Sequence, residues 1–192
     1  MPKATYHHGD LKSAILDAAE DVLCDRSLDA ISMRELARTA GVSPGAPYHH
    51  FGDRAGLVVA LCQRGFLRLE ALLSAANEKN GLLGMVRAYL EFAQTHSALY
   101  QLMFSAEATE GDRKTLLHPF AAPVFELLAQ DIEQKSSGSA PRGSNIAAVS
   151  VWCFMHGAAS LSIGPALEGR LQDTRLDHFA FDTLKILTGI TE

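Results

Sequence analysis

Apolar residues recur at three- and four-residue spacing along most of the chain, and this periodicity constrains the fold more than any other feature. After Asp10, the expected N-cap of the first helix, the apolar set is Leu11, Ala14, Ile15, Ala18, Ala19, Val22 and Leu23. This spacing places the set on one face of an α-helix. No stretch of useful length alternates apolar and polar residues between hairpin turns, as half-buried strands do. The sequence therefore predicts an all-α fold of about nine helices.

Two short helices joined by a tight turn follow the first helix. Ser32 and Glu35 form an S-x-x-E capping box, so a helix is expected to begin directly after Ser32. It is expected to end at Gly41, because glycine adopts the left-handed conformation after a helix C-terminus without steric cost. Ser43 is the expected N-cap of the next helix, with Pro44 at its first position. Helix, tight turn and second short helix predict a helix-turn-helix, whose second helix enters the DNA major groove.

The second short helix carries side chains suited to a close approach to DNA. Its outward positions are small or bear hydroxyl and imidazole groups: Ser43, Pro44, Gly45, Ala46, Tyr48, His49 and His50. Small residues let the backbone lie near base edges, and tyrosine and histidine can donate hydrogen bonds to phosphates. The pattern alone leaves an ordinary helical hairpin open as an alternative. Adjacent histidines point about 100° apart on a helix and are poor co-ligands, so no metal site is predicted.

The stretch ISMRELARTAGVSPGAPYHHFGDRAGL resembles the DNA-binding signature of the tetracycline-repressor (TetR/AcrR) family of transcriptional regulators. YHHGDLKSAIL is similar to one branch of that family, and VWCFMHGAASL resembles its Trp-His-Gly type of ligand domain. The resemblance implies base contacts from Gly45 and Ala46, a base or phosphate contact from Arg34, and phosphate or backbone contacts from Ser32, Tyr48, His49 and Arg54. Many relatives carry Lys or Thr where Gly45, Ala46 or Pro47 stand here, so direct base readout is expected to be sparse.

The chain is predicted to divide into two domains. Residues 1–53 form a three-helix domain with the helix-turn-helix, and residues 54–192 form a larger helical domain for ligand binding and dimerisation. A long helix from Arg54 to Asn80-Gly81 is expected to join them. Further helices are expected at about 82–95, 98–105, 112–135, 145–163 and 174–189, and Pro119 and Pro123 are expected to kink or split the third of these.

Aromatic and methionine side chains in the middle helices either line a ligand cavity or pack as ordinary core. These residues are Tyr89, Phe92, Met103, Phe104, Phe120, Phe125, Trp152 and Met155. His156 lies in an apolar helix, where a hydrogen-bonded core histidine is the usual outcome. The family resemblance adds the alternative that His156 contacts the ligand.

Residues 143–167 form a run of 25 residues without a formal charge, long enough to span a bilayer. Its serines, asparagine and histidine would be costly in a lone membrane span, so we interpret it as a helix buried in a core or a subunit interface. With the helix at 174–189 it is the expected dimer interface, to which Leu176, Phe179, Ala180, Leu184 and Leu187 contribute. Together with their symmetry mates these helices would form a four-helix bundle, which the resemblance also implies.

Composition and motifs exclude several function classes. A net charge of −5 argues against coating nucleic acid by bulk positive charge. Cytoplasmic location is expected from the N-terminus, which has no apolar signal segment, and from three widely spaced cysteines. No catalytic or cofactor motif is present, and a thiol at Cys153 on a buried helix would be inert beside His156, so neither an enzyme nor a cofactor is predicted.

The sequence as a whole predicts a homodimeric repressor that a small-molecule inducer releases from operator DNA, with no membrane partner. Two alternatives stay open. One is an activator of the same fold, and the other is a helical ligand- or protein-binding module whose helix-turn-helix is vestigial.

Overall fold

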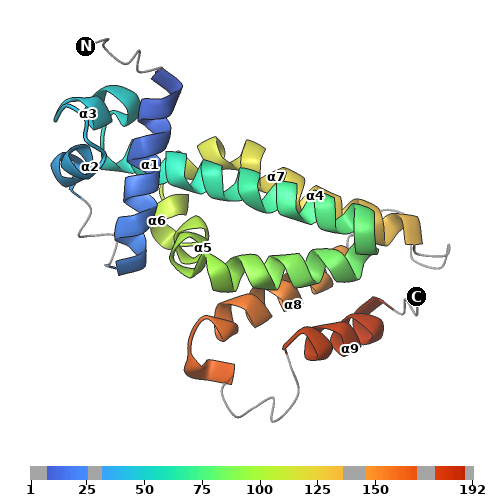
Figure 1. Cartoon of the computed structure of the whole chain (residues 1–192). Coiled ribbons are helices and arrows are strands. Elements are labelled where there is room, and N and C mark those ends of the chain that lie inside the picture. The colour runs from blue at the N-terminus through green and yellow to red at the C-terminus, as the bar shows by residue number, and fades with distance from the viewer. Residues whose placement is uncertain (1–7, 26–31, 136–145, 168–175, 189–192) are drawn as a thin grey trace. The chain divides into compact units, whose positions relative to one another are not determined.

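The structure is a computed structural model of the chain that describes residues 8–25, 32–135, 146–167 and 176–188 (Figure 1). Every element in these ranges is a helix, which confirms the predicted all-α fold. The elements are α1 (His8–Asp25), α2 (Met33–Thr39), α3 (Ala46–Phe51), α4 (Arg54–Thr95), α5 (Ser97–Met103), α6 (Ala106–Thr109), α7 (Arg113–Lys135), α8 (Ile146–Ser162), the 3-10 helix η2 (Pro165–Leu167) and α9 (Leu176–Thr188). Within these residues no helix has the length and apolarity that a membrane span requires.

The chain forms two compact units. The first unit consists of residues 1–65 and 98–117, and the second of residues 66–97 and 118–192. This division differs from the single boundary after residue 53 that we predict, because residues 98–117 belong with the N-terminal segment. Helix α4 contributes residues to both units.

The turn of the helix-turn-helix forms as the sequence predicts. Ser32 is the N-cap of α2, and its hydroxyl accepts a hydrogen bond from the amide of Glu35 at 3.5 Å. After α2, Gly41 has a φ of 67°. The amide of Gly41 donates to the carbonyl of Arg38 at 3.2 Å, and the amide of Val42 donates to that of Ala37 at 2.9 Å. These paired bonds form a Schellman motif, which satisfies the last carbonyls of α2 and fixes the chain direction into α3.

Helices α1 and α3 begin at other residues than predicted. Helix α1 begins at His8, so Asp10 lies inside it and is not its N-cap. Helix α3 begins at Ala46 with Gly45 as N-cap, and the carbonyl of Ser43 accepts from the amide of Ala46 at 3.0 Å in the preceding turn. The prediction of Ser43 as N-cap was therefore wrong. The later start places Pro47 in the first turn of α3, where its missing N–H breaks no helical hydrogen bond.

One arginine joins α4 to α1 in the first unit. The guanidinium of Arg64 donates to Glu20 at 2.7 Å through Nε and to Asp17 at 2.5 Å through Nη1. Ile15 of α1, Leu36 of α2 and Leu61 of α4 are almost completely buried in the same unit. A partly buried arginine that pairs with two carboxylates stabilises the fold more than a single exposed ion pair does. Its charges are less screened by solvent, and its orientation is fixed.

The chain reverses within α4, at the residue where we predict the long helix to end. Gly81 has a φ of 57° and a ψ of −146°, so the residues labelled α4 form two limbs, 54–80 and 82–95. A Cβ atom at position 84 would lie 2.5 Å from the carbonyl oxygen of Ala76, so the limbs approach each other closely after the reversal. Figure 1 shows the second limb running back beside the first.

Of the kink or split predicted at Pro119 and Pro123, the split does not occur, because α7 is one helix through both prolines. Its residues Val124, Leu128 and Ile132 are spaced four apart and are buried in the second unit. Burial of an apolar face contributes about 1.5–3 kcal/mol per large side chain, which offsets the backbone hydrogen bonds that the prolines remove.

The backbone conformation of Gly81 predicts that a side chain at this position would lower the stability of the fold. We expect Gly81→Ala to lower the free energy of unfolding by about 1–3 kcal/mol, because its backbone angles are strained for any residue with a Cβ atom. Urea unfolding followed by circular dichroism measures this change. Asn80→Ala is the matched control and is expected to change stability by less than about 0.5 kcal/mol. An unchanged unfolding midpoint for Gly81→Ala would show that the reversal does not need this conformation.

Candidate nucleic-acid interface and ligand region

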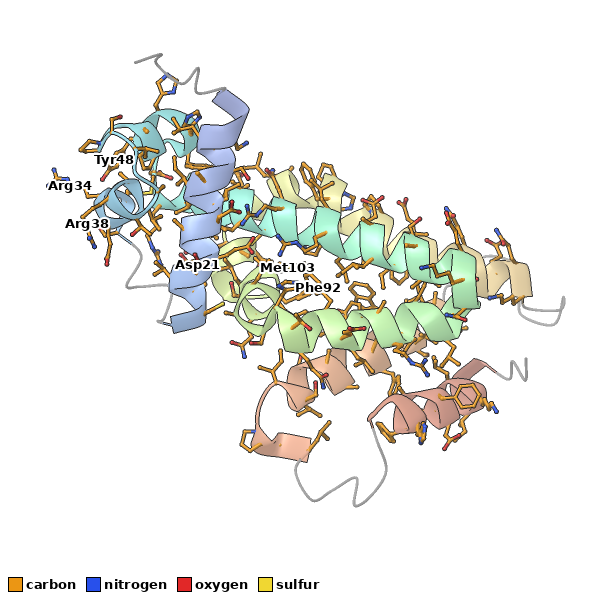
Figure 2. All side chains as sticks on the ribbon, in the orientation of Figure 1. Asp21, Arg34, Arg38, Tyr48, Phe92 and Met103 are labelled. Carbon is orange, nitrogen blue, oxygen red and sulfur yellow. The ribbon has the colours of Figure 1, made fainter. Side chains whose placement is uncertain are left out.

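Helices α2 and α3 present two arginines and a tyrosine on the surface of the first unit. Arg34 and Arg38 are exposed and lie one helical turn apart on α2, and the side chain of Tyr48 on α3 is 47% exposed. Figure 2 shows all three projecting from these helices. Sequence reasoning missed Arg38, although its position four residues after Arg34 places both on one helix face. Exposed guanidinium and hydroxyl groups are donors suited to phosphate oxygens and base edges.

Most of the other predicted contact residues are also on the surface. Ser32, Ser43, Pro44, Gly45 and His49 are exposed, and His50 is half-buried. The rings of His49 and His50 meet edge to face with centroids 5.5 Å apart.

Ala46 is the exception among the residues expected to face bases. Only 8% of its surface is exposed, so its methyl group packs inside the first unit. We correct the expected base contact of this side chain to a packing role. The packing role could have been expected from the sequence. A short helix that packs on two others must direct at least one side chain of its first turn into the core.

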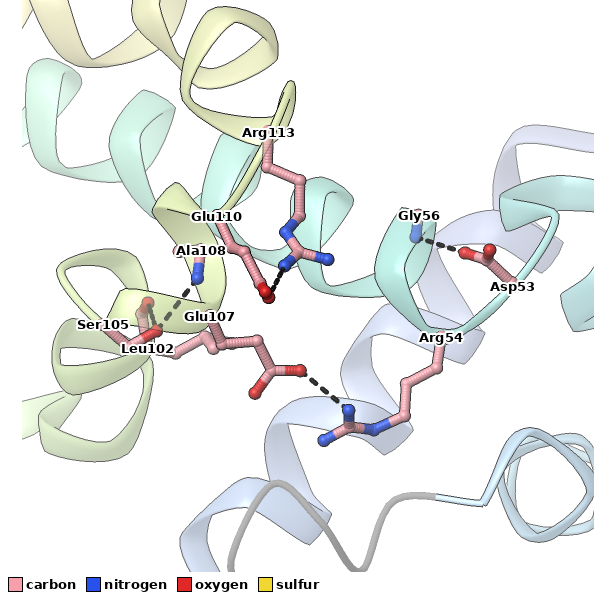
Figure 3. A network of polar contacts seen from close by, with 9 residues as sticks. All are labelled: Asp53, Arg54, Gly56, Leu102, Ser105, Glu107, Ala108, Glu110 and Arg113. Atoms are coloured by element: carbon pink, nitrogen blue, oxygen red, sulfur yellow. Dashed lines mark hydrogen bonds and ion pairs between the residues drawn. The ribbon is translucent and has the colours of Figure 1, made fainter.

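Arg54, predicted to hold a phosphate, is engaged within the first unit. Its Nη1 donates to Oε1 of Glu107 on α6 at 2.7 Å, and about a third of each side chain is exposed (Figure 3). Asp53 caps the first turn of α4 by accepting from the amide of Gly56 at 2.8 Å. Helix α6, which the sequence did not predict, is capped by Ser105, whose hydroxyl accepts from the amide of Ala108 at 3.1 Å. A phosphate contact by Arg54 would therefore require exchange of the Glu107 carboxylate for phosphate.

In the second unit, four of the predicted pocket residues form one cluster. The hydroxyl of Tyr89 lies 3.2 Å from Nδ1 of His156. The Trp152 ring meets the rings of Tyr89 and Phe125 edge to face, with centroids 5.9 and 5.8 Å away. Burial lowers the pKa of His156, so the imidazole is favoured in its neutral form. Tyr89 is fully buried, and the contacts are those of packed core with one internal polar pair.

The remaining predicted pocket residues are dispersed. Phe92 contacts His96 with ring centroids 5.2 Å apart, Met155 is buried, and Phe120 is half-buried. Met103 and Phe104 belong to the first unit, where Phe104 contacts Tyr100.

A cavity of about 660 Å³ lies elsewhere in the second unit, and none of the nine predicted pocket residues lines it. Its walls come from both limbs of α4, the end of α7 and α9: Leu72, Ala75, Ala76, Lys79, Asn80, Leu82, Leu83, Gly84, Arg87, Ala88, Glu91, Lys135, Phe181, Leu184 and Lys185. Its volume is in the range of small-molecule sites.

Three of the predicted interface residues of α9 contact or are buried by their own chain. Ala180 and Leu184 are buried, and Phe179 contacts Phe154 of α8 with ring centroids 5.6 Å apart. Side chains already covered in one protomer contribute little to a second contact, so the interface prediction was wrong for Ala180 and Leu184. The side chains of Leu176 and Leu187 lie outside the described residues.

Comparison with known protein families identifies the family to which this chain belongs. Residues 15–61 match the family described as bacterial regulatory proteins, tetR family, and residues 82–183 match the tetracyclin repressor-like C-terminal domain. The chain belongs to the tetR family of bacterial regulatory proteins. This is a regulatory family and not an enzyme family, in agreement with the sequence prediction.

The chain is also similar to individual curated proteins and to a solved structure. The chain is 32% identical over 115 residues to the transcriptional regulator BetI of Rhizobium meliloti, covering 55% of this chain and 57% of BetI. It is 30% identical over 130 residues to the transcriptional activator FasR of Mycolicibacterium smegmatis, covering 62% of this chain and 59% of FasR. These matches span little more than half the length of the curated relatives. A structure of a protein of unknown function from Rhodococcus sp. RHA1 superposes with a TM-score of 0.83 at 29% identity, covering 99% of this chain and 100% of that one.

The lowered pKa of His156 predicts how stability depends on pH. Below about pH 6.5 the unfolded chain binds a proton at this histidine more readily than the folded chain does. The stability that the neutral imidazole supports is therefore present above that pH and falls as the pH drops. We expect His156→Gln, which can still hydrogen-bond to Tyr89, to lose less stability than wild type between about pH 7.5 and 5.5.

Urea midpoints across this pH range measure the difference, and His118→Gln, at an exposed position on α7, is the control. Parallel pH profiles for wild type and His156→Gln would contradict the assignment.

Proposed function

We propose that the protein is a transcriptional regulator that binds operator DNA through α2 and α3. The observation that carries this proposal is the pair Arg34 and Arg38 on one exposed face of α2, beside the half-exposed Tyr48 of α3. These donors project from a helix-turn-helix with a complete Schellman turn, in a chain that is acidic overall. A local basic face on an acidic chain favours a specific DNA contact over nonspecific coating.

Each exposed residue has a role that follows from its chemistry. The small residues Ser43, Pro44 and Gly45 at the entry to α3 allow the backbone to approach base edges. Tyr48 and His49 donate to phosphates, and Arg34 reaches a base edge or a phosphate. Arg38 adds a phosphate contact that holds α2 across the DNA backbone.

Dimerisation follows from the small size of this contact surface. A single short helix makes few base contacts, and two-fold dimers double them by binding half-sites about 34–36 Å apart. Helix α8 offers an exposed apolar stripe for the second copy: Ile146, Val149, Cys153 and Leu161, of which Ile146 is 71% exposed and Val149 46%. Gly157 lies on the same line, and no atom of the chain would lie within 4 Å of a Cβ there. A stripe with a small residue at its centre lets two helices approach closely.

Repression is the direction that we propose. A dimer bound over a promoter excludes polymerase by occupancy alone, whereas activation requires a further productive contact with the transcription machinery. Activation is the second candidate, because the relative FasR is named a transcriptional activator. Reporter expression after deletion of the gene rises for a repressor and falls for an activator.

Effector control would act through α4, whose first limb has continuous helical backbone angles from Arg54 to Asn80. A small molecule that binds one conformation of the second unit better than another shifts the DNA-binding equilibrium by its differential affinity. The coupling is reciprocal, so operator DNA would weaken inducer binding by the same factor.

Removal of Tyr48 tests the DNA contact. We expect Tyr48→Ala and Arg34→Ala each to weaken binding to the upstream intergenic DNA by about tenfold, the effect of one lost hydrogen bond to a charged group. Arg38→Ala should weaken binding similarly and lower the salt slope by about one. Fluorescence anisotropy at about 50 and 200 mM salt measures both quantities.

Lys114→Ala, at an exposed basic position on α7, is the control and should bind DNA like wild type. Salt-independent binding that none of the substitutions changes would overturn the proposal and favour a module with a vestigial helix-turn-helix.

The stripe on α8 predicts how the dimer can be broken. We expect Val149→Arg to convert the dimer to a monomer and to abolish tight operator binding, because it places an unpaired charge in an apolar interface. Light scattering after size exclusion measures the mass. Leu116→Arg, at an exposed leucine outside the stripe, should remain dimeric. A dimeric Val149→Arg protein would place the interface on another surface.

A further inference from the structure

The ion pair between Arg54 and Glu107 joins the start of α4 to α6 within the first unit. Nη1 of Arg54 donates to Oε1 of Glu107 at 2.7 Å, and Figure 3 shows the two side chains extended toward each other. Arg54 lies three residues after Phe51, the last residue of α3, and it is the first arginine or lysine after that helix. The pair therefore engages the cation that lies nearest in sequence to the helix proposed to face DNA.

Other carboxylates near this pair are engaged elsewhere. Asp53, adjacent to Arg54 in sequence, accepts from the amide of Gly56 at 2.8 Å and so caps α4. Glu110 pairs with Arg113, with Oε2 2.6 Å from Nη2. The carboxylate that holds Arg54 thus comes from a residue 53 positions away along the chain.

Hydrogen bonds around α6 fix the position of Glu107. The Ser105 hydroxyl accepts from the amide of Ala108 at 3.1 Å and donates to the carbonyl of Leu102 at 2.9 Å. Oγ1 of Thr109 donates to the carbonyl of Ser105 at 3.2 Å. Because its short helix is held at both ends, Glu107 presents its carboxylate to Arg54 from a defined place.

A carboxylate and a phosphate diester offer a guanidinium the same kind of anionic oxygen acceptor. About a third of the Arg54 and Glu107 side chains is exposed, so an outside anion can approach the guanidinium without unfolding of the chain. Ion pairs of this exposure contribute little to stability, because solvent screens them. Exchange of one acceptor for the other is therefore feasible, and it weakens DNA binding by the amount that the internal pair contributed.

We propose that Glu107 competes with operator DNA for Arg54. In the free protein the guanidinium pairs with Glu107. On the operator it donates instead to a phosphate oxygen, which releases the counterion of that phosphate, and the Glu107 carboxylate returns to solvent. Glu107 thereby lowers operator affinity without touching DNA, as a residue that acts through Arg54. This inference rests on the DNA contact of the proposed function and adds to it a contact that the protein itself opposes.

Neutralisation of Glu107 tests the competition. Glu107→Gln keeps an oxygen acceptor for Arg54 and removes the charge. We expect it to tighten binding to the upstream intergenic DNA by about threefold for each DNA-binding head, and so by about tenfold for a dimer. Glu110→Gln removes the same charge three residues away and is the matched control, with an expected change of at most about twofold. Fluorescence anisotropy measures the affinities, and circular dichroism verifies the fold of each variant.

A second variant separates competition from net charge. Glu107→Asp keeps the charge but shortens the side chain by one carbon, so it should weaken the pair with Arg54. It is expected to bind the operator more tightly than wild type and less tightly than Glu107→Gln.

Substitution of Arg54 shows whether the effect passes through this residue. In an Arg54→Gln background, Glu107→Gln should no longer tighten binding, because the group for which the two anions compete is gone. Arg54→Gln should also lower the salt slope of binding by about one for each head, with or without Glu107→Gln. A purely structural role of Arg54 would leave the salt slope unchanged.

Three outcomes would overturn the inference: equal affinities for Glu107→Gln and Glu110→Gln, the same gain from Glu107→Gln in the Arg54→Gln background, or a folded Glu107→Gln protein that binds more weakly than wild type. Any of these, with wild-type binding that is salt-dependent and weakened by Tyr48→Ala, would leave the proposed function standing. Absence of salt-dependent binding by wild type would contradict the proposed function and this inference together.

Discussion

The continuous backbone hydrogen bonding of α4 from Arg54 to Asn80 is the constraint on which the rest of the structure depends. This limb contributes residues to both compact units, and its start is held by three side-chain interactions in the first unit. Asp53 caps its first turn, Arg54 pairs with Glu107, and Arg64 pairs with two carboxylates of α1. At its other end the backbone of Gly81 reverses the chain.

Features encoded by neighbouring residues were predictable from the sequence. The cap at Ser32, the turn at Gly41 and the end of the long helix at Gly81 each depend on a few adjacent residues and on backbone angles that favour particular residue types. The start of α3 was misplaced because Ser43 and Gly45 both make acceptable caps, and only the position of Pro47 in the first turn separates them. The continuity of α7 was missed because the burial of Val124, Leu128 and Ile132, a tertiary effect, outweighs the local preference of proline.

The candidate sites were less predictable, for a physical reason. Apolar periodicity shows that a helix face is buried but not which partner covers it, so Ala180 and Leu184 were assigned to a second subunit when their own chain buries them. Aromatic composition likewise did not separate the packed cluster around Trp152 from a cavity lining. Lys79 and Lys185 resemble ordinary solvated charges in the sequence, and only the fold brings them to one cavity.

The division of the chain limits how operator DNA and an effector can influence each other. The proposed DNA contacts lie on α2, α3 and the start of α4 in the first unit, whereas the cavity of about 660 Å³ is lined by residues of the second unit. The two ligands therefore share no lining residue, and any coupling between them must come from conformations of the chain that they stabilise unequally.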